Sequence, residues 1–370
     1  MQSFIPQVKL LMGPGPSDVS QRVLNALARP TIGHLDPSFI NLMDETKTLL
    51  QYTFKTNNAL TMPISAPGSA GMEACFVNLV EPGDKVIVCQ NGVFGSRMKE
   101  NVVRIGGKLV LIDDPWGEQT KPEKLRAALQ ANPDTKIVAF VHAETSTGVR
   151  NDAQTLCAIA KEFNCITIVD AVTALAGIEL RVDDWQIDAI YSGTQKCLSC
   201  VPGLSPVSFS ENALIKIKSR KTPVQSWFLD LNLILGYWGD GAQRAYHHTA
   251  PVNSIYALHE SLLVVKEEGV ENGWLRHQQN HEYLRERLAE INLDLTIDEA
   301  YRLPQLNLVN IPQGVNDAAV RKLLLNEYQL EIGAGLGALA GKVWRIGLMG
   351  ESSNKGKIDK CVNALREVLQ

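Results

Sequence analysis

The chain has 370 residues, of which 45% are hydrophobic and 21% are charged. This composition is that of a soluble globular protein with a large core, and it excludes wholesale disorder. Lysine and arginine number 36 against 40 aspartates and glutamates, a net charge of −4, which argues against nucleic acid as a partner held by bulk electrostatics. At roughly 150 residues per domain we expect about two or three domains.

The start of the chain and its cysteines bear on its environment. Residues 1–6 lack the basic region and apolar run of a secretory signal, and no stretch approaches the roughly 18 uncharged apolar residues of a membrane span. We therefore expect a cytoplasmic protein without a membrane partner.

Among seven cysteines, Cys197 and Cys200 form a lone C-x-x-C pair. Because no second pair accompanies it, reduced thiols are expected rather than a metal site.

In chain order, the first 20 residues, with Gly-Pro-Gly-Pro at 13–16, predict an irregular arm. Apolar runs then alternate with helical patterns up to about residue 210. The expected strands are 60–65, 85–90, 109–113, 136–141, 166–170, 189–192 and 206–209. Several are rich in Val and Ile throughout, which is typical of a sheet covered on both faces. The alternation predicts an α/β fold, a mainly parallel seven-stranded sheet wrapped by helices.

One of the intervening helices has a clear start and a clear apolar face. It follows Asp152, a plausible N-cap, and places Leu156, Ile159, Ala160 and Phe163 on one side at helical spacing. Such a face predicts packing against the sheet.

The character of the chain changes after about residue 253. A long amphipathic helix leads through charged helices to strand-like 306–311, a helix near 316–328 and strand-like 342–348. This order predicts a smaller α+β domain. We expect an N-terminal arm over 1–20, a large domain over 21–252 and a small C-terminal domain over 253–370.

Two polar side chains follow neighbouring strands of the predicted sheet. Asp170 ends one strand, and Lys196 follows the next, 26 residues on. Ligands of open parallel sheets bind at the carboxyl ends of the strands. Alone, an aspartate there caps a turn and a lysine is a surface group. Together they are what a pyridoxal phosphate site needs, an amine for a Schiff base and an acid that keeps the pyridine nitrogen protonated.

Three further features fit such a site. The small residues 66–71 follow a strand and open a helix, whose N-terminus favours a phosphate group, although a plain turn would look the same. Phe94 follows another strand and could stack on a flat ring. Arg345 stands opposite the apolar face of the strand at 342–348, where a guanidinium could hold a substrate carboxylate as a two-point fork.

The sequence, with these residues in this order, resembles the class V, fold-type I pyridoxal phosphate aminotransferases, and within them the alanine–glyoxylate (serine–pyruvate) branch. The resemblance covers nearly the whole chain and rests on seven short motifs in the family's order. They are Gly-Pro-Gly-Pro at 13–16, Glu-Pro-Gly-Asp at 81–84, Asn-Gly-Val-Phe-Gly at 91–95, Glu-Thr-Ser-Thr-Gly at 144–148, Tyr-Ser-Gly-Thr-Gln-Lys at 191–196, Tyr-His-His-Thr at 246–249 and Trp-Arg-Ile-Gly at 344–347.

The resemblance implies a role for each matching position. Lys196 matches the family's Schiff-base lysine and Asp170 the acid at the ring nitrogen, the two catalytic residues. Arg345 matches the arginine that binds the substrate carboxylate. The matched cofactor-binding positions are Gly68, Ser69, Ala70, Phe94, Thr145, Asp170, Val172, Gln195, Lys196, Tyr246 and Thr249.

The resemblance also implies an assembly and a reaction. Tyr246 and Thr249 match residues that reach the phosphate from a second subunit, so a homodimer is expected. Phe94 replaces the tryptophan of near relatives, and Pro67 and Ser69 depart from residues common in the phosphate loop. The implied reaction is a ping-pong amino transfer from alanine or serine to glyoxylate or pyruvate through pyridoxamine phosphate.

Other functions stay open to different degrees. A 2-aminoethylphosphonate or phosphoserine transaminase would share the cofactor site. A cysteine desulfurase is disfavoured, because it needs a nucleophilic cysteine in the loop region ahead of Arg345, and no cysteine lies between Cys200 and Cys361. Residues 333–338 fit the G-x-G-x-x-A pattern of an NAD-dependent oxidoreductase, but a strand rather than a helix is expected after them. A non-catalytic cofactor-binding module would not need Lys196 and Arg345. His247 and His248 are adjacent without a third ligand, so no metal is expected.

Overall fold

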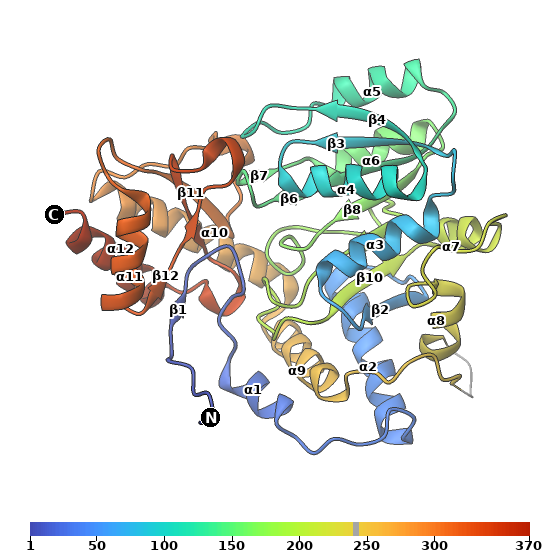
Figure 1. Cartoon of the computed structure of the whole chain (residues 1–370), viewed down its shortest axis with the longest axis horizontal. Coiled ribbons are helices and arrows are strands. Elements are labelled where there is room, and N and C mark those ends of the chain that lie inside the picture. Colours follow the sequence, from blue (N-terminus) through green and yellow to red (C-terminus); the bar gives the residue numbers. More distant parts are fainter. Residues whose placement is uncertain (240–243) are drawn as a thin grey trace.

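The computed structural model of the chain describes residues 1–239 and 244–370. Figure 1 shows a larger part around the central sheet and a smaller part built from the C-terminal elements, with strand β1 (Leu10–Leu11) beside the latter. Within the described residues, no helix has the length and apolar character required to cross a bilayer.

The central sheet has seven strands and is mainly parallel, as predicted. Its strands, in spatial order, are β2 (Leu60–Ile64), β10 (Ser205–Phe209), β9 (Ala189–Tyr191), β8 (Ile166–Asp170), β5 (Thr135–Val141), β3 (Lys85–Gln90) and β4 (Lys108–Asp113). Only β10 runs antiparallel to its neighbours. The interior strands are buried along almost their whole length, which explains their continuous apolar runs.

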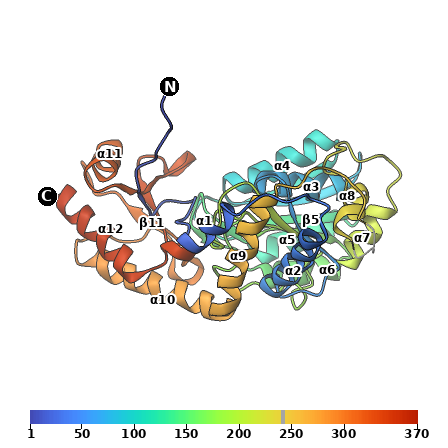
Figure 2. The same ribbon diagram turned by 90° about the horizontal axis from the view of Figure 1, so that it is seen from below.

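Helices cover both faces of this sheet. Figure 2 shows α3 and α4 on one face and α2 and α6 on the other. The helices of the larger part are α1 (Gln21–Leu27), α2 (Pro37–Phe54), α3 (Gly68–Leu79), α4 (Val93–Ile105), α5 (Pro122–Ala131), α6 (Ala153–Glu162), α7 (Glu211–Lys218), α8 (Leu231–Trp238) and α9 (Val252–Glu268). In α6 the predicted cap is confirmed, since Asp152 accepts a hydrogen bond from the Thr155 N–H at 3.1 Å.

The smaller part contains a three-stranded antiparallel sheet with helices packed on it. Its elements are α10 (Val270–Ala289), β11 (Leu306–Asn310), α11 (Asp317–Glu327), β13 (Gly333–Ala334), β14 (Val343–Gly347) and α12 (Lys355–Val368). The sheet order is β11-β14-β13. Trp344, Ile346 and Leu348 are buried in the core of this part, which leaves Arg345 on the opposite face of β14, as predicted.

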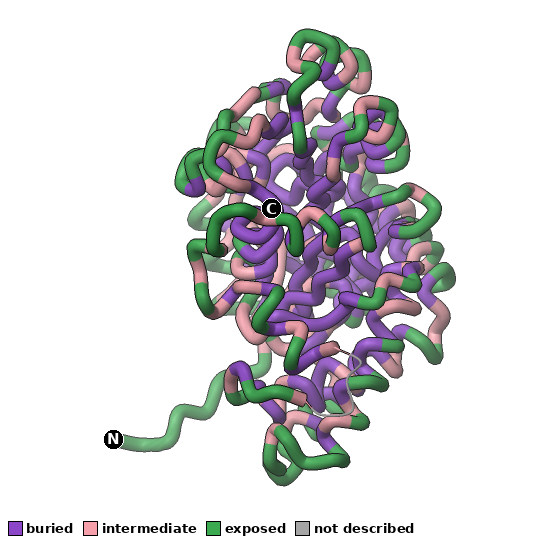
Figure 3. Tube along the Cα trace, turned by 90° about the vertical axis from the view of Figure 1, so that its right-hand side faces the viewer, coloured by how far each residue is buried: buried purple, intermediate pink, exposed green. Residues whose placement is uncertain are grey.

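Short elements complete the chain. They are the parallel pair β1 with β12 (Leu330–Glu331), the hairpin β6 (Ala143–Glu144) with β7 (Val149–Arg150), and three single turns at Glu299–Tyr301, Gly337–Leu339 and Gly350–Ser352. The arm predicted as irregular therefore contributes one short strand, β1, to the smaller part. Figure 3 shows its first residues extending from the body as an exposed segment.

Two hydrophobic cores are present. The larger includes α9 and Val270 and also takes in Leu306 and Leu308 of β11 and Val343 of β14. The smaller contains Leu284 and Leu288 of α10, together with Met12 from the arm. Packing thus changes from one core to the other within α10. The domain boundary after residue 252 stays a proposal.

Candidate active site

A pocket of about 240 Å³ lies where the parallel strands end. It is lined by Pro67, Gly68, Ser69, Met72, Phe94, Arg97, Ala143, Thr145, Asp170, Val172, Thr173, Tyr191, Gln195 and Lys196. Eight of these were candidate residues from the sequence. They converge because the loops after β2, β3, β5, β8 and β9 all leave the same edge of the sheet.

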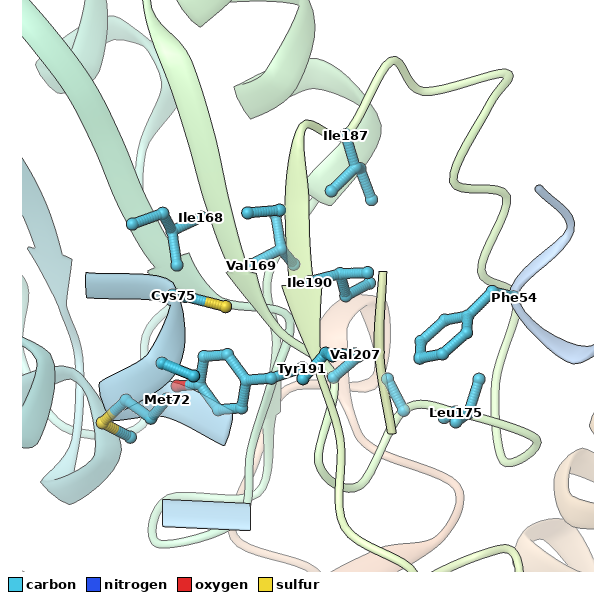
Figure 4. Packing of buried hydrophobic residues seen from close by; sticks show 14 of the residues in the cluster. Phe54, Met72, Cys75, Ile168, Val169, Leu175, Ile187, Ile190, Tyr191 and Val207 are labelled. Atoms are coloured by element: carbon cyan, nitrogen blue, oxygen red, sulfur yellow. The ribbon is translucent and has the colours of Figure 1, made fainter. Parts of the chain in front are cut away.

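Asp170 is the last residue of β8 and is 2% exposed. One carboxylate oxygen accepts the Val172 N–H at 2.8 Å, and the other accepts the Tyr191 hydroxyl at 2.7 Å. Burial raises the pKa of Asp170 to about 7. Figure 4 shows the Tyr191 side chain extending toward Met72 and Cys75, an apolar packing that holds the hydroxyl against Asp170.

Lys196 is partly buried on the loop after β9. Burial lowers the pKa of its amine to about 8, and the charge of Arg345 acts in the same direction. The Nζ atom donates a hydrogen bond to the carbonyl of Pro14 in the N-terminal arm. At Gly15, which has φ +105°, a Cβ atom would lie 2.8 Å from Lys196 Cδ. The arm therefore covers the amine closely, and only glycine leaves room there.

The loop 66–71 provides an anion cradle. Helix α3 begins at Gly68 without a side-chain cap, so the Gly68 and Ser69 N–H groups have no intrahelical acceptor. A Cβ on Gly68 would lie 3.3 Å from Val172 Cγ2. The side-chain oxygen of Gln195 is buried without a hydrogen-bond partner among the described residues. The free helix N–H groups in this pocket fit a bound phosphate group, whereas the unpartnered Gln195 oxygen is an acceptor and would need a donor of its own.

Arg345 lies just outside the pocket and is 8% exposed. Its Nε donates to the Ala334 carbonyl at 2.7 Å, and its Nη1 donates to the Thr145 carbonyl at 3.3 Å. Burial lowers its pKa. These two carbonyls fix the guanidinium beside the pocket residue Thr145 and leave further N–H groups for an anion.

Besides Arg345, three candidate residues do not line this pocket. Ala70 lies in the first turn of α3, where its N–H donates to the Pro67 carbonyl at 2.7 Å. Tyr246 and Thr249 are exposed on the segment between α8 and α9, and Tyr246 is 62% exposed. Their expected roles stay predictions.

Three residues at the site were not foreseen in these positions. The Tyr191 hydroxyl donates a hydrogen bond to Asp170. Arg97 places its guanidinium 5.0 Å from the centre of the Phe94 ring. Glu144 is fully buried and contacts the first turn of α4. Glu144 and Tyr191 belong to motifs quoted above, but a motif alone does not tell which backbone groups a side chain will meet.

The structure also decides against the dinucleotide alternative. Residues 333–338 form β13 and a single turn, whereas the fingerprint must open a helix of a βαβ unit. All seven cysteines are buried and unpaired. Within the described residues, no three His, Cys, Asp or Glu side chains are grouped to hold a metal ion.

The family model "Aminotransferase class-V" matches residues 17–349. An alanine–glyoxylate aminotransferase from Felis catus is 39% identical over 365 residues, covering 98% of this chain and 88% of its own. An (S)-ureidoglycine–glyoxylate transaminase from Bacillus subtilis is 34% identical over 381 residues, covering 98% and 91%. The crystal structure of an alanine–glyoxylate aminotransferase from Nostoc has a TM-score of 0.98 at 46% identity, covering 100% and 97%. The chain therefore belongs to the class V aminotransferase family.

Proposed function

We propose that this enzyme uses pyridoxal phosphate to transfer an amino group from a small amino acid, alanine or serine, to a small 2-oxo acid, glyoxylate or pyruvate. The observation that carries the proposal is a single pocket lined by a lysine, an aspartate and an uncapped helix N-terminus. The similar proteins from cat, Nostoc and Bacillus subtilis all have glyoxylate in their names, which favours glyoxylate as the acceptor.

The pocket residues fit the three polar ends of this cofactor. The N–H groups of Gly68 and Ser69, with the Gln195 amide, would hold its phosphate. Asp170 would accept a hydrogen bond from the protonated ring nitrogen, and that cation would offset the cost of the buried carboxylate. Lys196 would provide the amine that bonds to its aldehyde carbon.

The remaining roles concern the ring faces, the substrate and the proton. Phe94 and Val172 would cover the two faces of the ring, with Thr145 beside it. When bound, the cofactor supplies an electron sink for the bonding pair of the substrate α-carbon. Once the substrate amine has taken its place, Lys196, with a pKa of about 8, would be free to take the α-proton on Nζ and to give it up again during the transfer. Arg345 would hold the substrate carboxylate.

We further propose a cytoplasmic homodimer. Tyr246 is 62% exposed, and Trp227, whose ring stacks on that of the next residue, His247, is 65% exposed. Two large aromatic side chains exposed to this degree fit a surface that a second copy covers. In such a dimer Tyr246 and Thr249 would reach the phosphate of the partner site.

Borohydride trapping tests the attachment point. Wild-type protein incubated with pyridoxal phosphate is reduced with borohydride and digested, and the labelled peptide is found by mass spectrometry. We expect the label on Lys196, its loss in Lys196→Ala, and its retention in Lys161→Ala. Lys161 is a suitable control because it is partly buried too, paired with Asp188. Label on another lysine, or no label on wild type, would refute the assignment.

Substrate choice is tested separately by half-reactions. The loaded enzyme is mixed with single amino acids, and conversion of the cofactor to its amine form is followed by absorbance. Glyoxylate and pyruvate are then compared in the reverse half. Conversion by phosphoserine or 2-aminoethylphosphonate, but not by alanine or serine, would contradict the proposed substrate class.

A further inference from the structure

Helix α4 carries Phe94 in its first turn, yet its own N-cap residue, Gly92, has no side chain to cap it. The N–H groups of that turn are satisfied from the β6 hairpin instead. The Val93 N–H donates to the Ser146 hydroxyl at 2.9 Å. The N–H groups of Phe94 and Gly95 donate to one oxygen of Glu144 at 3.0 and 3.3 Å.

The second oxygen of Glu144 is also occupied. It accepts the Ser146 N–H at 3.1 Å and the Ser146 hydroxyl at 2.5 Å. Three of the four partners are backbone N–H groups, which can only donate, and they reach both oxygens. These bonds favour the ionised carboxylate and oppose the effect of burial, which raises the pKa of Glu144. The side chain is 0% exposed. A Cβ on Gly92 would lie 2.5 Å from Glu144 Cδ, so the glycine makes room for this contact.

This carboxylate therefore contacts two segments that enter the pocket. Through α4 it fixes the backbone of Phe94, and through its own strand it lies between the pocket residues Ala143 and Thr145. The Thr145 carbonyl is the one that Arg345 contacts at 3.3 Å. The contrast with α3 is direct, since α3 keeps its first N–H groups free for a ligand and α4 does not.

We propose that Glu144 is a positioning residue, which caps α4 and thereby holds the Phe94 ring at the angle needed to stack on the bound cofactor. This inference rests on the proposed function. Glu144 does not touch the cofactor in this account, and its effect passes through Phe94.

Glu144→Gln tests the idea with a side chain of nearly the same shape. Whichever way the amide turns, its NH₂ group faces backbone or hydroxyl donors, so at least one buried donor loses its acceptor. We expect the affinity of cofactor-free protein for pyridoxal phosphate to fall about tenfold, and the visible circular dichroism of the bound cofactor to change in sign or amplitude.

Two matched variants separate positioning from loss of fold. Asp188→Asn removes another buried, multiply bonded carboxylate, which accepts the Thr167 N–H at 2.9 Å at the opposite end of the sheet. We expect it to lower the unfolding temperature while leaving cofactor affinity and dichroism unchanged. Should Glu144→Gln not fold, Ser146→Ala removes part of the same cap and is measured in the same way, with a smaller expected loss of affinity.

A double-mutant cycle with Phe94→Ala decides the route of the effect. If Glu144 acts through Phe94, the Gln substitution weakens binding about tenfold in wild type and less than about twofold in the Ala background. An equal factor in both backgrounds, or unchanged affinity in Glu144→Gln, overturns the proposal while the proposed function stands. Wild-type protein that does not bind pyridoxal phosphate at all would overturn both.

Discussion

The buried carboxylate of Asp170 makes cofactor-free protein sensitive to pH in a way that one substitution should remove. Its pKa is about 7 in the folded protein against an ordinary value of 3.8. Since the pKa is higher in the folded protein than in the unfolded chain, Asp170 contributes most to the free energy of unfolding at low pH. This contribution is lost as the pH rises from about 4 through 7. The cost arises because burial disfavours the charged form.

The size of the effect follows from linkage. A difference of about three pKa units at 1.36 kcal/mol per unit gives about 4 kcal/mol of lost unfolding free energy at pH 8, and about 2 kcal/mol at pH 5. Asp170→Asn has no charge to lose, and its amide can keep both contacts. The Asn oxygen accepts the Val172 N–H, and the NH₂ group donates to the Tyr191 hydroxyl.

We therefore expect cofactor-free Asp170→Asn to be more stable than cofactor-free wild type at pH 8, by up to about 4 kcal/mol, with the gap narrowing toward pH 5. Urea unfolding at one protein concentration and several pH values measures this. With pyridoxal phosphate bound the order should reverse, because the ring cation pairs with the carboxylate alone. Equal stabilities across the pH range, or a less stable variant at pH 8 without cofactor, would show that the reasoning about Asp170 is wrong.

Two other substitutions have expected outcomes. Arg345→Lys removes the planar fork and the contact to Thr145. In steady-state kinetics, KM for alanine should therefore rise about 10- to 100-fold while kcat changes less. An unchanged KM for every amino acid tested would show that Arg345 does not bind the substrate. Gly92→Ala places a Cβ 2.5 Å from Glu144 and should lower the free energy of unfolding by about 1–3 kcal/mol. The control Gly33→Ala, where no atom lies closer than 4.0 Å, should lower it little. Urea unfolding measures both, and equal losses would contradict the close packing inferred for Gly92.

The larger fold was predictable because its strands are continuous apolar runs that end at turn residues. The expected strands at 85–90 and 166–170 match β3 and β8 in both bounds. Asp170 and Lys196 could be paired from the sequence because parallel strands end at a common edge. Arg345 could be placed opposite the apolar face of its strand by alternation alone.

What could not be predicted depends on contacts between distant segments. Glu144 meets N–H groups 49 and 50 positions earlier in the chain, and Lys196 meets a carbonyl 182 positions earlier. Periodicity carries no information about such pairs. Tyr191 was visible within a motif, but its hydrogen bond to Asp170 follows from the register of β8 against β9, which pairs those two residues.

The arm at the start of the chain ties together elements that lie far apart in the sequence. The Gly347 N–H, at the end of the strand that carries Arg345, donates to the Met12 carbonyl at 2.7 Å. A few residues on, the Ser17 N–H donates to the Gln195 carbonyl at 2.9 Å, next to Lys196. A strap of six residues thus spans from the carboxylate-binding strand to the reactive amine. Deleting these six residues would remove the backbone that links the two strand ends and covers the Lys196 amine.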